Sequence, residues 1–157
     1  MDMDFGLLLL RLFFGLAIAS HGAQKLFGWF DGFGIEGTGM AFAKLGYEPG
    51  QLFAVIAGLS EFVGGLLLAL GLFTPLGAAM VMGVMLNAIY VDWEKGFYMA
   101  TEKPMLFGFA ALALAFTGPG RYSLDHGRKW EPQGIGWGFS ALALAVIAAL
   151  ITLLIRQ

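Results

Sequence analysis

Long apolar stretches alternate with short polar or glycine-rich segments along this chain of 157 residues. Five of them are long enough for helices that cross a bilayer, and we expect these helices at about residues 5–22, 52–72, 76–91, 98–117 and 137–155. An α-helix rises about 1.5 Å per residue, so about 20 residues reach across the roughly 30 Å of hydrocarbon. The pattern therefore predicts an all-α integral membrane bundle in which residues 1–157 form a single transmembrane domain.

The stretch Leu52–Leu72 contains one ionisable side chain, Glu61, close to its midpoint. At about 100° per residue, small residues share one side of this helix with Glu61, and branched apolar residues occupy the opposite side. The small side comprises Ala54, Ala57, Gly58, Gly64 and Gly65, and the apolar side comprises Leu59, Val63, Leu66 and Leu70. Small residues let a second helix backbone approach closely, so we expect Glu61 to point into the bundle.

A charged carboxylate at the centre of a bilayer costs roughly 2.5–3.5 kcal/mol, so Glu61 needs a compensating partner. A mostly small face of the first stretch carries a cation at each end, Arg11 and Lys25. We predict an ion pair between Arg11 and Glu61, because each is otherwise an isolated buried charge. In the alternative, Arg11 extends to the near interface, Lys25 interacts with the C-terminal dipole of its helix, and Glu61 only fixes helix packing.

The segments between the five apolar stretches predict a surface helix and a tight turn. Residues 27–50 are rich in glycine and aromatic residues, which is typical of an interfacial loop, and residues 39–45 are expected to form a short surface helix. Residues 73–75 are too few for anything but a tight turn, so the spans on either side must form an antiparallel hairpin. The fourth span is expected to begin before Pro104, which brings Glu102 to the edge of the hydrocarbon.

Polar residues within or beside the spans are the candidates for a functional polar core: Arg11, His21, Lys25, Glu61, Asn87 and Glu102. The first span ends and the fourth begins on the same side of the membrane, so we expect His21, Lys25 and Glu102 to approach one another there. Asn87 is expected to form an interhelical hydrogen bond, as an amide in a membrane helix usually does.

Composition narrows the classes of function. Hydrophobic residues make up 59% of the chain and the mean hydropathy is +0.78, as in a membrane protein. The net charge of −2 comes from scattered residues, so no basic patch for nucleic acid is present. Without cysteine, the chain can form no disulfide, thiolate nucleophile or iron–sulfur ligand. The histidines, His21 and His126, are expected on opposite membrane sides, and no metal-ligand spacing occurs, so we expect no intrinsic cofactor.

Five spans would place the two termini on opposite sides of the membrane. The segment 118–136 carries Arg121, Arg128 and Lys129 close together, and clustered positive residues mark the cytoplasmic side. We therefore expect this segment and the N-terminus to be cytoplasmic.

Three segments resemble the DoxX family of small prokaryotic membrane proteins over about residues 7–125. They are His21–Lys25 (HGAQK), Glu61–Gly65 (EFVGG) followed by Leu70–Leu72, and Gly118–Asp125 (GPGRYSLD). The resemblance implies a four-helix bundle in the prokaryotic plasma (inner) membrane, to which residues 137–155 add a fifth helix. The family is named for a subunit associated with a terminal quinol oxidase and a thiosulfate:quinone oxidoreductase, and its members are often labelled oxidoreductases.

Three functional hypotheses follow. In the first, the chain is a non-catalytic or accessory subunit of a quinone-linked membrane redox system, with a quinone head group held by His21, Lys25 and Glu102 and the electrons supplied by a membrane or peripheral partner protein. In the second, it transports a small solute or protons through titration of Glu61. In the third, it is a membrane scaffold or assembly protein with a purely structural polar core, and homo-oligomers are compatible with each of the three.

Overall fold

The computed structural model describes residues 2–132 and 134–156, and the regular structure in these residues is helical. The α-helices are α1 (Asp2–Phe27), α2 (Gly34–Lys44), α3 (Gly50–Leu70), α4 (Thr74–Val91), α5 (Glu102–Thr117) and α6 (Ile135–Leu154). A 3₁₀-helix, η1 (Trp93–Lys95), and a π-helical turn, η2 (Phe97–Thr101), precede α5. Within the described residues, five runs are long and apolar enough to cross a membrane: Met3–Phe27, Gly50–Leu70, Thr74–Val91, Phe97–Thr117 and Ile135–Leu154. The predicted all-α membrane bundle is confirmed.

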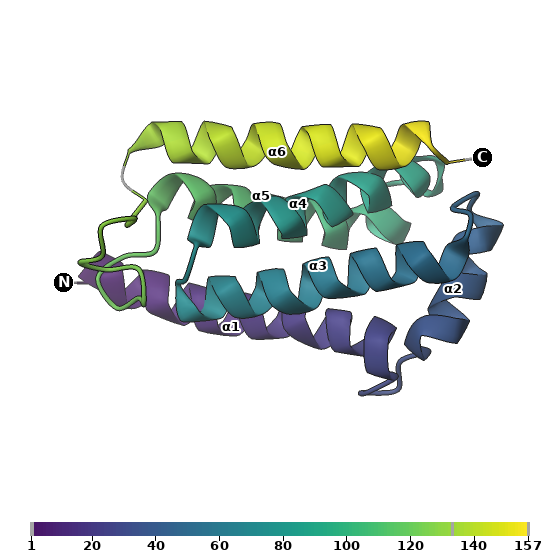
Figure 1. Cartoon of the computed structure of the whole chain (residues 1–157), viewed down its shortest axis with the longest axis horizontal. Helices are drawn as coiled ribbons and strands as arrows, with labels where there is room; N and C mark the ends of the chain where they lie inside the picture. Colours follow the sequence, from purple (N-terminus) through teal and green to yellow (C-terminus); the bar gives the residue numbers. More distant parts are fainter. Residues whose placement is uncertain (1, 133, 157) are drawn as a thin grey trace.

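The bundle is built from helices that run nearly along one axis (Figure 1). Helix α3 packs against α1 and α4, and α6 packs against α4 and α5. The short helix α2 contacts α1 and α3 and lies across one end of the bundle, and the two termini lie at opposite ends (Figure 1).

Glycines on α1 and α3 bring the two backbones into direct contact. A Cβ added at Gly15 would lie 2.5 Å from the carbonyl oxygen of Gly65, and one added at Gly22 would lie 2.3 Å from the amide nitrogen of Phe62. Such distances leave no room for any side chain, so these contacts fix the register of α1 against α3. The predicted small side of α3 is buried as expected, and it includes Glu61.

A tight turn joins α3 to α4, as predicted. Helix α3 ends at Leu70 and is followed by Gly71 in the left-handed conformation, with the Leu72 amide donating to the carbonyl of Leu67. The segment that follows α5 docks on this turn, because the amides of Leu124 and Asp125 donate to the carbonyls of Leu70 and Gly71, respectively.

Helix boundaries differ from the sequence-based expectation in two places. Helix α1 continues to Phe27, five residues past the expected end at residue 22, and stops where Gly28 has a φ of 70°. The surface helix expected at residues 39–45 begins earlier, at Gly34. The fourth span begins at Phe97, before Pro104 as expected, and Pro104 falls in the first turn of α5, where a missing amide hydrogen is tolerated.

Candidate ligand cavity

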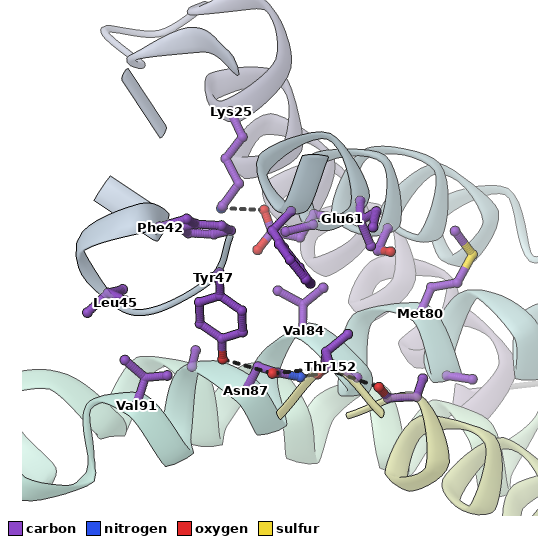
Figure 2. A pocket seen from close by; sticks show the side chains of 18 of the residues that line it. Lys25, Phe42, Leu45, Tyr47, Glu61, Met80, Val84, Asn87, Val91 and Thr152 are labelled. Atoms are coloured by element: carbon purple, nitrogen blue, oxygen red, sulfur yellow. Dashed lines mark hydrogen bonds and ion pairs between the residues drawn. The ribbon is translucent and has the colours of Figure 1, made fainter. Parts of the chain in front are cut away.

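A cavity of about 430 Å³ lies between α3, α4 and α6, beneath α2 and the α2–α3 connection (Figure 2). Most of its lining is apolar, including the rings of Phe42 and Phe53 and the side chains of Met80, Val84 and Leu144. Its polar lining residues are Lys25, Tyr47, Ser60, Glu61, Asn87, Asp92 and Thr152. A mainly apolar cavity with a few polar groups, of a volume between roughly 300 and 1,000 Å³, is typical of a small-molecule site.

One side of the cavity carries an ion pair between α1 and α3. The Lys25 ammonium lies 2.5 Å from the Glu61 carboxylate, whose side chain is only 4% exposed. Glu61 thus has the compensating cation that a buried acid requires. The α1–α3 register produces this pair, because Gly22 lies against Gly58 and Phe62 and the Lys25 side chain then reaches Glu61.

The predicted Arg11–Glu61 pair is wrong. Arg11 is fully buried at the opposite end of α3, where its Nη2 donates to the carbonyl of Tyr122 at 2.5 Å and its guanidinium lies against Gly71. The prediction counted residues inward from each helix start. That count failed because the N-terminal part of α1 extends past the end of α3. Arg11 therefore lies beside Gly71 and not beside Glu61. The Nε and Nη1 atoms of Arg11 have no hydrogen-bond partner among the described residues.

The other side of the cavity carries a hydrogen-bonded group centred on Asn87 (Figure 2). The hydroxyls of Tyr47 and Thr152 each lie 2.9 Å from Asn87 Oδ1, to which each can donate. The Asn87 Nδ2 donates to the carbonyl of Gly83 at 3.0 Å. The predicted interhelical hydrogen bond of Asn87 is confirmed, and it joins α4 to α6 and to the α2–α3 connection.

Tyr47 and Arg156 close the end of the cavity near α2. Tyr47 is 5% exposed, and Arg156 Nε donates to the carbonyl of Leu45 at 2.5 Å. The Arg156 guanidinium also lies 5.7 Å from the centre of the Tyr47 ring, within cation–π range. Burial raises the pKa of the Tyr47 hydroxyl, an effect that the Arg156 charge partly opposes. Tyr47 therefore keeps its proton at neutral pH and remains a hydrogen-bond donor.

Two members of the predicted polar core lie away from the cavity. His21 Nδ1 hydrogen-bonds to Gln24 Oε1 at 2.9 Å, and the His21 ring lies 5.8 Å from that of Phe107 on α5. Glu102 is exposed at the start of α5. The structure thus brings Lys25, Glu61 and Asn87 to one cavity and leaves Arg11, His21 and Glu102 outside it.

Tyr47 and Thr152 were missed from the sequence. Thr152 carried a usable signal, because it is a polar residue in an apolar span, the same feature that singled out Asn87. Tyr47 carried only a weak signal, since a lone tyrosine beside glycine and proline is typical of an interfacial loop.

The lining of the cavity includes hydrogen-bond donors and an acid that a ligand could contact. Lys25 carries three N–H donors, of which the Glu61 carboxylate engages one, and Asn87 Nδ2 on the other side carries two, of which the Gly83 carbonyl engages one. Glu61 is the titratable acid of the lining near the middle of α3. Among the described residues, no three His, Cys, Asp or Glu side chains are grouped so that they could hold a metal ion.

Comparison with known proteins gives two matches. The family model described as DoxX matches residues 6–93. The chain is also 31% identical over 132 residues to the "Uncharacterized membrane protein Rv3486" of Mycobacterium tuberculosis (strain ATCC 25618 / H37Rv), covering 74% of this chain and 77% of that protein. No solved structure matches the chain.

Proposed function

Because this chain belongs to the DoxX family of membrane proteins, we propose that it is an accessory subunit of a quinone-linked redox system and that the cavity binds the quinone. The observation that carries the proposal is the placement of polar groups on two sides of an otherwise apolar cavity. A quinone has a flat ring with carbonyl acceptors at opposite ends. Lys25 supplies donors on one side and the second N–H of Asn87 Nδ2 supplies one on the other, so the lining suits both the ring and its two oxygens.

A bound quinone would supply two-electron, two-proton redox chemistry, and in this proposal a partner protein supplies the electrons. Phe42, Phe53 and the α4 side chains that line the cavity would hold the ring of such a quinone. His21 and Glu102 have no part in this site, in contrast to the sequence-based hypothesis, because neither lines the cavity. In this proposal the N-terminus faces the cytoplasm, and the cavity lies nearer the other surface of the membrane.

The test is quinone binding by the purified protein in a mild detergent. We expect quinone to be extractable from the preparation and added quinone to bind. We expect Lys25→Met to weaken binding at least about tenfold. A hydrogen bond from a charged group contributes roughly 1.4 kcal/mol or more, and about 1.4 kcal/mol corresponds to a factor of ten in Kd. Lys103→Met is the matched control, since Lys103 is exposed and lies outside the cavity, and it should change the Kd less than twofold. Absence of quinone binding by the unaltered protein contradicts the proposal.

A second candidate function is transport of protons or a small solute, and the position of Glu61 favours it. This titratable carboxylate lines a cavity near the middle of a spanning helix, where such acids serve in proton relays. Flux into liposomes that depends on pH and is lost in Glu61→Gln supports transport. If neither quinone binding nor flux is found, the scaffold hypothesis is the one that remains.

A further inference from the structure

The cavity has an uncovered side between α3 and α6. Helix α3 packs on α1, α2 and α4, whereas α6 packs on α4 and α5. Helix α4 therefore forms the floor of the cavity, and α3 and α6 form its walls. Ile56 on α3 and Leu144 on α6 line the cavity and yet are 43% and 49% exposed, respectively. Both belong to membrane-spanning helices, so the surface that they border faces lipid acyl chains.

Protein contacts narrow the two ends of the cavity. At the end near α2, Tyr47 is buried beneath Arg156, which is bonded to Leu45. At the deeper end, α3 and α4 approach so closely that a Cβ added at Gly64 would lie 3.1 Å from the carbonyl oxygen of Gly77. The lining side chains that meet water are those of Lys25 and Asp92, at 23% and 28% exposed, whereas the side between α3 and α6 is open to the bilayer.

The lining changes in character along the cavity. Tyr47, Asn87 and Thr152 form a polar group beside the end near α2, whereas Met80 and Leu144 lie deeper along their helices. The volume of about 430 Å³ is near the lower end of the range for drug-sized ligands, so the cavity can enclose a ring but not a long chain as well. A long tail must leave through the open side.

We propose that the cavity takes its ligand laterally from the bilayer, through the opening between α3 and α6 that Ile56 and Leu144 border. The ligand class is an amphipath with a compact polar head and one long apolar tail. The head lies beside the Tyr47–Asn87–Thr152 group and the Lys25–Glu61 pair, and the tail passes between Ile56 and Leu144 and stays in the lipid. Helix α6 is therefore a wall of the binding site. This inference rests on the proposed function for the identity of the head, and on the cavity alone for the path of the tail.

The first experiment compares a quinone that bears a decyl tail with the same ring without a tail, in protein reconstituted into nanodiscs. Leu144→Trp fills the opening. Leu150→Trp is the matched control, because Leu150 is exposed on the same helix but does not line the cavity. The tailed quinone partitions into lipid equally for all variants, so only the ratio of Kd values between variants is interpreted.

We expect Leu144→Trp to weaken binding of the tailed quinone at least tenfold and to change binding of the tail-less ring less than twofold. Leu150→Trp should change neither. Equal weakening of both ligands, or of neither, by Leu144→Trp overturns the lateral opening. Failure of the unaltered protein to bind either ring overturns the proposed function instead.

A second experiment tests the opening without quinone. The unaltered protein is placed in phosphatidylcholine vesicles that contain a fatty acid with a photoreactive diazirine on its chain. After illumination, we expect adducts on cavity residues such as Met80 and Val84, which an acyl chain reaches only through the opening. Adducts confined to outward-facing residues such as Leu150 overturn the proposal, whatever the outcome with quinone.

Discussion

Individual residues determine how this bundle tolerates charge in its interior. Glu61 is the buried acid, and Lys25 reaches it from a position where its own side chain is 23% exposed. The pair is therefore asymmetric, since Lys25 retains partial hydration and Glu61 does not. Removing the lysine leaves a buried carboxylate without its cation, whereas removing the glutamate leaves a lysine that can extend towards the interface.

A double-mutant cycle on this pair tests the asymmetry. We expect Lys25→Met to lower the free energy of unfolding by about 3 kcal/mol, and Glu61→Leu to lower it by less. The double variant should be more stable than the sum of the single losses predicts, as measured by unfolding in mixed micelles.

The control cycle pairs Arg11→Leu with Glu61→Leu. These two residues lie at different levels of the bundle and share no contact, so their effects should add. Strong coupling in the Arg11 cycle, or additivity in the Lys25 cycle, would contradict the assignment of partners.

At the scale of helices, glycine contacts decide which side chains meet. Hydropathy predicted each spanning helix, because a run of about twenty apolar residues in a bilayer satisfies its backbone hydrogen bonds by forming a helix. The register between helices was not predictable, because helices of equal hydropathy can slide past one another at no cost to their lipid contacts. Gly15 and Gly22 fix that register only after the partner backbone is known, and this is why the sequence assigned Glu61 the wrong cation.

Substitution of one interface glycine tests the role of the register. We expect Gly22→Val to destabilise the bundle by more than about 3 kcal/mol, because its Cβ would lie 2.3 Å from the Phe62 amide nitrogen and the helices would have to separate. Ligand binding should be lost with it, since Lys25 would move away from Glu61.

Gly6→Val is the matched control on the same helix, because a Cβ at Gly6 meets nothing within 4 Å. It should leave thermal stability and binding nearly unchanged. A Gly22→Val variant as stable as Gly6→Val would show that the α1–α3 contact is looser than described.

At the scale of the whole molecule, the bundle has two dissimilar ends. One end holds the α3–α4 turn, the buried Arg11 and the docked segment after α5, with the basic residues Arg121, Arg128 and Lys129. The other holds α2, the adjacent end of the cavity and Arg156. The clustered basic residues favour a cytoplasmic location for the first end.

Reporter fusions test this orientation. A fluorescent reporter joined after residue 132 should be active, and one joined after residue 156 should be inactive because it is exported. A phosphatase reporter should give the reverse pattern. Equal signals at both positions would contradict five spans, and a fully inverted pattern would contradict the cytoplasmic N-terminus alone.

The contribution of α6 to the cavity also has a consequence for the synthesis of the protein. This helix leaves the ribosome after α1 to α5, yet it supplies Leu144, Ala148 and Thr152 to the cavity. Until it inserts, Asn87 on α4 lacks its Thr152 partner and has only its bonds to Tyr47 and Gly83. A nascent chain would thus pass through a stage in which all other helices are in the membrane but the binding site does not exist.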